Sequence, residues 1–93
     1  YIFYMIDVLA AAGEAEGLPR EMAMQLARAT VAGAALLADR AGDTPEQLRV
    51  NVTSPGGTTQ AGLGVLMDAE TGLAPLMRAT VKAAADRSRE LKA

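Results

Sequence analysis

The chain has 93 residues and a mass of 9.6 kDa, enough for one domain, and 51% of its residues are hydrophobic. Alanine supplies 20 of these residues and aromatic residues only three, so each buried residue removes little apolar area from water. A net charge of −2 with scattered basic residues gives no nucleic-acid footprint, and the absence of histidine and cysteine excludes disulfides, thiolate or imidazole metal sites and Ser-His or Cys-His nucleophiles.

The first expected helix runs from about Tyr1 to Glu16, with Gly17 as its C-terminal stop and Pro19 just beyond. Nearly all sides of this helix are apolar, which is the pattern of a helix surrounded by protein. Because a 93-residue monomer can hardly surround it, we predict a dimer. The apolar run is also shorter than the ~20 residues that span a bilayer, so no membrane partner is expected.

Two further helices are expected before the middle of the chain. The second begins near Pro19 and continues through Asp39, before Gly42. The third has Thr44 as N-cap, Pro45 at its first position and Gln47 completing a capping box. It must end before the Ser54-Pro55 pair, because proline disfavours helical geometry in the residue before it.

Two helices are expected in the second half of the chain. The fourth starts at Gly57 or Thr58 and ends at about Ala69, where residues 70–72 break it. The fifth runs from Leu73 to Leu91 and carries an apolar stripe with the alternating spacing that suits packing against another long helix. The stripe consists of Met77, Val81, Ala84, Ser88 and Leu91. With 20 alanines against eight valines plus isoleucines, the predicted fold class is all-α, a bundle of about five helices.

The segment at 51–59 combines hydroxyl residues, two glycines and a helix start. Glycines allow the backbone to approach a ligand closely, and the first amides of a helix have no intrahelical partner. This segment is therefore a candidate anion site. The residues alone favour the simpler interpretation, a helix–helix turn in which Pro55 and Gly56 reverse the chain and Thr58 caps the helix. A P-loop is excluded because Leu63 stands where its lysine is required, and a dinucleotide fingerprint is excluded because Met67 replaces its third glycine.

Residues 52–63, Val-Thr-Ser-Pro-Gly-Gly-Thr-Thr-Gln-Ala-Gly-Leu, and 44–48, Thr-Pro-Glu-Gln-Leu, closely resemble the signature of the pyrroline-5-carboxylate reductase family. The resemblance extends from 17–20 to 87–91 and so covers essentially the whole chain as that family's C-terminal helical dimerisation domain. Met67 differs, because the family usually has a polar or acidic residue there.

The resemblance implies a reductase that passes hydride from NADPH or NADH to the cyclic imine of 1-pyrroline-5-carboxylate and forms L-proline. The absence of cysteine fits a reducing, cytoplasmic setting. Residues 1–93 would form its dimerisation and substrate-binding domain, interleaved with a second copy in a homodimer that is often gathered into larger rings. The nucleotide-binding domain would lie outside this chain, so the isolated segment is expected to be inactive.

The same resemblance assigns roles around the substrate. Backbone N–H groups of the loop would hold the substrate carboxylate, Val52 would form an apolar wall, and the Thr59 hydroxyl would be the catalytic group at the ring nitrogen. The substrate-binding residues are then Val52, Ser54, Gly56, Gly57, Thr58 and Thr59. The alternative is a purely structural dimerisation module in which the loop is only a turn.

Overall fold

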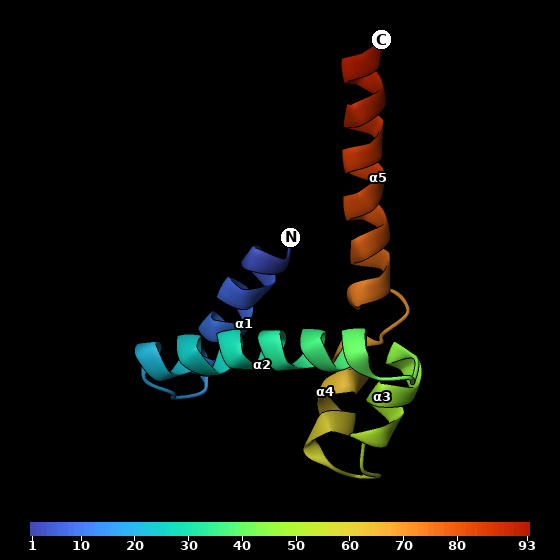
Figure 1. Ribbon diagram of the computed structural model, residues 1–93. Helices are drawn as coiled ribbons and strands as arrows, with labels where there is room; N and C mark the ends of the chain where they lie inside the picture. Colours follow the sequence, from blue (N-terminus) through green and yellow to red (C-terminus); the bar gives the residue numbers. More distant parts are fainter. The chain divides into compact units, whose positions relative to one another are not determined.

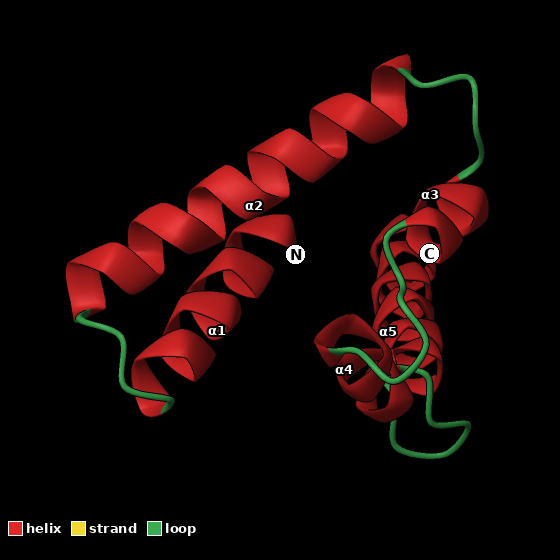
Figure 2. Cartoon of the chain, turned by 90° about the horizontal axis from the view of Figure 1, so that it is seen from below, coloured by secondary structure: helices red, strands yellow, loops and turns green.

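The computed structural model describes all 93 residues, and five helices joined by loops make up its regular structure (Figure 1). Figure 2 shows no strand, which confirms the predicted all-α class. The helices are α1 (Ile2–Ala15), α2 (Arg20–Arg40), α3 (Pro45–Asn51), α4 (Thr58–Leu66) and α5 (Leu73–Lys92). The chain divides into two compact units, Tyr1–Leu48 and Arg49–Ala93. None of the helices is both long and apolar enough to cross a membrane.

Helix α1 ends where Gly17 was expected to stop it. Gly17 has a φ of +107°, and its N–H donates to the carbonyl of Glu14 at 3.0 Å. The N–H of Leu18 donates to the carbonyl of Gly13 at 3.1 Å, which completes a Schellman motif. A positive φ of this kind favours glycine, so the stop is encoded locally.

Helices α1 and α2 form the packed pair of the first unit, and Figure 2 shows α1 lying alongside the first half of α2. The buried hydrophobic residues at their contact are all alanines: Ala10 on α1, and Ala23 and Ala27 on α2. Gly13 faces the same contact, since a Cβ atom there would lie 3.6 Å from the Cβ atom of Ala23 on α2 and 3.2 Å from Leu18 Cδ1 in the connecting loop. Small side chains let the two helices approach closely, but they bury little apolar area.

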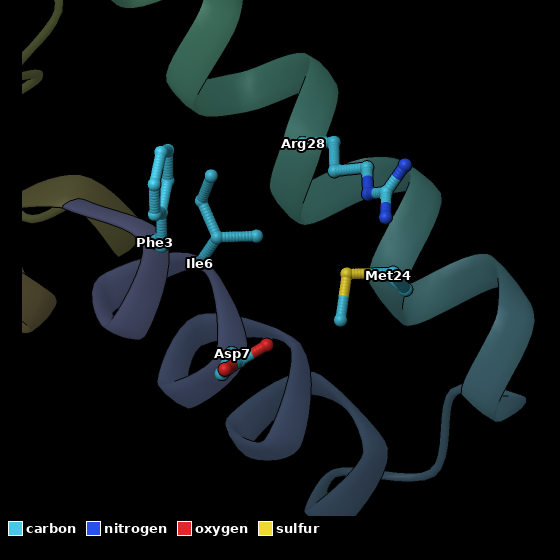
Figure 3. Close-up of a pocket in the computed structure, with 5 residues that line it drawn as sticks. All are labelled: Phe3, Ile6, Asp7, Met24 and Arg28. Atoms are coloured by element: carbon cyan, nitrogen blue, oxygen red, sulfur yellow. The ribbon is translucent and has the colours of Figure 1, made fainter.

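Large apolar side chains of α1 remain exposed in the single chain. Phe3 is 86% exposed, and Tyr4 and Val8 are also exposed. A shallow pocket of about 380 Å³ lies between the two helices, lined by Phe3, Ile6 and Asp7 of α1 and by Met24 and Arg28 of α2 (Figure 3). The first unit therefore keeps most of the apolar surface that led us to predict a dimer.

The link from α2 to α3 confirms the predicted cap. The N–H of Gln47 donates to Thr44 Oγ1 at 3.2 Å, and α3 begins at Pro45. Helix α2 ends at Arg40, one residue later than expected, and Ala41 is already extended with φ −70° and ψ 148°. The stop therefore does not depend on a left-handed glycine at Gly42.

The α4–α5 loop departs from the prediction, because α4 ends at Leu66 instead of continuing to about Ala69. Asp68 Oδ1 accepts the N–H of Glu70 at 2.9 Å and the N–H of Thr71 at 2.8 Å. Aspartate favours such local turns over helix because its short side chain competes for backbone donors. These bonds lower the pKa of Asp68, and the bond from Thr71 has the largest effect. Their stabilising effect is therefore fully present above the ordinary pKa of 3.8 and is lost as the pH falls through the lowered pKa.

Gly72, the N-cap of α5, is buried in this loop. A Cβ atom there would overlap the backbone carbonyl oxygens of Leu66 and Asp68. We expect Gly72→Ala to lower the free energy of unfolding by about 1–3 kcal/mol, the usual effect of overpacking. Urea unfolding followed by circular dichroism, at matched protein concentration, measures this. The control is Gly62→Ala on α4, where a Cβ atom meets open space and alanine favours the helix. Equal stabilities of the two variants would contradict the steric argument.

Helix α5 matches its predicted bounds to within one residue at its C-terminal end, and Lys82 pairs with Asp86 on it at 2.7 Å. Asp86 also pairs with Arg89 at 3.0 Å. Val81 and Leu91 of the predicted apolar stripe are exposed, at 58% and 70%. The charged face is solvated, and the apolar stripe is exposed from Val81 to Leu91, with Met77 partly buried.

Candidate functional site

The loop between α3 and α4 is built around a tight turn at Ser54-Pro55-Gly56-Gly57. The N–H of Gly57 donates to the carbonyl of Ser54 at 3.0 Å, and Gly56 has a φ of +72°. Proline at the second position and a residue with positive φ at the third are the signature of a type II turn. Gly56 is therefore required for its backbone conformation, and Pro55 pre-sets the bend.

Gly57 is the N-cap of α4 and joins the turn to the helix in an extended conformation, with φ −86° and ψ 179°. No side chain caps the helix. The amides of Thr58 and Thr59 therefore lie at a helix N-terminus whose donors have neither an intrahelical acceptor nor a capping side chain. Such an end carries about half a positive charge, which favours a bound carboxylate or phosphate.

Gly57 is restricted by the turn itself. A Cβ atom at this position would lie 3.1 Å from the carbonyl oxygen of Ser54 and 3.3 Å from its Cβ atom. Both contacts are tighter than ordinary van der Waals distances, so a side chain at Gly57 would push against the turn as well as into the space in front of α4.

The predicted residues fall on three parts of this loop. Ser54, Gly56 and Gly57 belong to the turn, and Thr58 and Thr59 form the first turn of α4 with exposed side chains. Val52 lies one residue beyond the end of α3 and is 64% exposed. A local hydrogen bond holds the start of the loop to α3, because Thr53 Oγ1 donates to the carbonyl of Arg49 at 2.6 Å.

Two of the amides that were expected to face the substrate are engaged within the loop. Gly57 N–H bonds Ser54, as described above, and Gly56 N–H donates to Gln60 Oε1 at 2.6 Å. No role for Gln60 was predicted from the sequence. A signal was nonetheless present, since Gln60 is the third residue of a helix that begins after Gly57, the position from which a glutamine reaches back in a capping box.

A second pocket, of about 370 Å³, lies between the last turn of α3 and α4. Among the first three residues of α4, only Gln60 lines this pocket. Arg49 Nη1 contacts Met67 Sδ across the pocket at 2.9 Å. Its lining residues are Arg49, Val50, Thr53, Gln60, Leu63, Gly64 and Met67. The Met67 thioether thus faces the guanidinium of Arg49 as a weak acceptor.

The loop between α3 and α4 has no titratable side chain from Val52 to Ala61, so its affinity for an anion must come from backbone dipoles and hydroxyl groups. No group of three or more histidine, cysteine, aspartate or glutamate residues comes together as a potential metal site. Backbone amides at a helix start and neighbouring hydroxyl groups can together hold an anion such as a carboxylate.

The chain matches known proteins along its whole length. A family model described as pyrroline-5-carboxylate reductase dimerisation matches residues 1–91. The pyrroline-5-carboxylate reductases of Arabidopsis thaliana and Pisum sativum are 53% and 50% identical to it over 91 residues, which is 98% of this chain and 32% and 33% of those proteins. The chain thus spans about a third of the length of the curated relatives it matches.

A solved structure supports the same relationship. The crystal structure of Plasmodium falciparum pyrroline carboxylate reductase with NADP bound superposes with a TM-score of 0.92 at 29% sequence identity, covering 100% of this chain and 35% of that one. The resemblance carried by residues 44–48 and 52–63 is therefore confirmed by sequence and by structure. The chain belongs to the pyrroline-5-carboxylate reductase dimerisation family.

Proposed function

We propose that the full-length protein is an NAD(P)H-dependent reductase that converts 1-pyrroline-5-carboxylate to L-proline. Residues 1–93 act in it as the domain that forms the homodimer and holds the substrate carboxylate. The observation that carries the proposal is the uncapped N-terminus of α4 directly after the glycine turn, within a chain that matches the reductase family from residue 1 to residue 91.

The substrate carboxylate binds at the start of α4. The backbone amides of Thr58 and Thr59 donate to it, and the extended backbone at Gly57 leaves room for its approach. The Ser54 hydroxyl lies on the same turn and supplies a further donor. Val52 covers the apolar side of the ring. None of these contacts requires a lysine or arginine.

Thr59 acts at the ring nitrogen. A nicotinamide cofactor supplies the hydride that forms the new C–H bond at the imine carbon, and the C=N double bond becomes a single bond. The ring nitrogen must then carry a proton, which the Thr59 hydroxyl delivers from water or holds in place by orienting the imine. The loop offers no histidine, cysteine or tyrosine for this role.

The residues of this chain do not themselves suit the cofactor. All of its regular structure is helical, and a dinucleotide fingerprint needs a strand that leads into a helix. We therefore assign the binding of NADPH or NADH mainly to parts of the full-length protein outside residues 1–93. The NADP bound to the Plasmodium falciparum reductase supports a nicotinamide cofactor.

The test of the carboxylate site is Gly57→Val in the full-length enzyme. The branched side chain pushes against Ser54 and blocks the start of α4, so binding is lost in the ground state and the transition state alike. Hydrogen bonds to charged groups contribute about 1.5–3 kcal/mol, so the KM for pyrroline-5-carboxylate should rise by roughly ten- to a hundredfold with a smaller change in kcat.

The matched control is Gly42→Val, which lies in the exposed α2–α3 loop where a Cβ atom meets open space. It should leave both constants near those of the parent enzyme. If the parent enzyme is active and Gly57→Val has an unchanged KM, the loop is only a turn, and the purely structural module is favoured. A parent protein that fails to reduce pyrroline-5-carboxylate with either cofactor would remove the proposed activity.

A further inference from the structure

The side chain of Gln60 ties the glycine turn to the helix that follows it. Its Oε1 atom accepts the N–H of Gly56 at 2.6 Å, and Gln60 is the third residue of α4. The bond therefore runs from the helical turn that contains the Thr58 and Thr59 amides back to the middle of the type II turn. Gln60 is exposed, and it has no place in the chemistry proposed for the loop.

This hydrogen bond acts on the one peptide whose orientation defines the turn. Type I and type II turns place their ends alike but differ in the direction of the middle peptide, which here joins Pro55 and Gly56. The N–H of that peptide is the one that Gln60 accepts. An acceptor at this point holds the peptide in the type II orientation, with the φ of +72° seen at Gly56. Because the acceptor is the side chain of Gln60, the bond also ties this peptide to the first turn of α4.

We infer that Gln60 is a positioning residue for the substrate carboxylate. It acts through the turn: by holding Gly56 N–H, it presets the backbone of Gly57 and the amides of Thr58 and Thr59 before the substrate arrives. A preset anion site loses less conformational freedom on binding than one that must be ordered by its ligand. This inference rests on the proposed function, because it assigns to the same loop the substrate carboxylate as its ligand.

The experiment compares Gln60→Met with the parent in the full-length enzyme, using two substrates. Methionine keeps the length of the side chain but offers only a weak acceptor. For pyrroline-5-carboxylate we expect the KM to rise by about two- to tenfold, the range that one net hydrogen bond covers, with little change in kcat. For 1-pyrroline, which has the same imine but lacks the carboxylate, we expect kcat/KM to stay unchanged. The control, Gln25→Met, makes the same chemical change at an exposed position of α2 and should alter neither substrate.

The outcomes separate this inference from the proposed function. A KM effect confined to the substrate with a carboxylate supports a positioning role. Equal losses for both substrates would show a general structural role, and unchanged kinetics, or a fall in kcat alone, would overturn the inference directly. If the parent enzyme does not reduce pyrroline-5-carboxylate, the proposed function itself fails. If the parent is active and Gln60→Met behaves like it, only the role of Gln60 is lost.

Discussion

Replacing Thr59 by valine in the full-length enzyme is expected to lower the turnover of pyrroline-5-carboxylate more than its binding. Valine keeps the β-branched shape and the backbone amide at the start of α4 and removes only the hydroxyl group. If that hydroxyl delivers the proton to the ring nitrogen, kcat should fall by ~10²–10⁴, the range typical of a positioned proton-transfer group. A smaller fall would indicate that Thr59 only orients the imine. Steady-state kinetics on the folded, dimeric variant measures both constants.

The contrast with Gly57→Val makes this result specific. Gly57→Val is expected to raise KM, because it weakens binding of the substrate in the ground state and in the transition state equally. Thr59→Val acts chiefly on the chemical step and therefore on kcat. Thr30→Val, an exposed threonine on α2, supplies the control for the chemical change itself. Unchanged kcat and KM in Thr59→Val would return Thr59 to the status of an ordinary residue in the first turn of a helix.

The isolated chain is expected to be a dimer in solution. Its buried hydrophobic residues are three alanines, while Phe3, Tyr4 and Val8 of α1 are exposed to 86%, 72% and 49% (Figure 3 shows the Phe3 side chain). Leaving such side chains in water costs ~25 cal/mol for each Å² of apolar surface. Light scattering at low micromolar concentration should therefore give twice the mass of the chain.

Val8→Glu probes that surface. Val8 lies on a different side of α1 from Ala10, which faces α2, so a charge there should spare the contact within the chain. An uncompensated charge buried between two copies costs about 3–5 kcal/mol, which weakens the dimer by roughly a hundredfold or more. Sedimentation at a series of concentrations measures the Kd.

Gly42→Glu, in the exposed loop after α2, places the same charge where a side chain meets open space and should leave the dimer intact. A parent chain that stays monomeric, fully helical and cooperative at micromolar concentration would contradict the dimer. An unchanged Kd in Val8→Glu would instead place the interface elsewhere on the chain.

Much of the fold could be predicted because its signals are local. Gly17 stops α1 through its own positive φ, Thr44 caps α3 through the N–H of Gln47, and Pro45 starts it. Each of these devices acts within five residues, so neighbouring residues alone specify it. The prediction for α4 failed at its end for a related reason, since Asp68 offered its carboxylate to the amides of Glu70 and Thr71 in competition with the helix.

The sequence by itself determined the helical class, the order of the five helices and, through the family resemblance, the loop that carries the candidate site. The tertiary structure decided which atoms of that loop are already engaged: Gly56 N–H belongs to Gln60 and Gly57 N–H to Ser54, so the amides at the start of α4 become the candidate donors. It also decided that the fully buried residues of the contact between α1 and α2 are alanines, with Ile6 and Met24 packed against them. Hydrogen-bond partners and burial depend on where side chains and backbone meet in space, and periodicity specifies only which residues share a face.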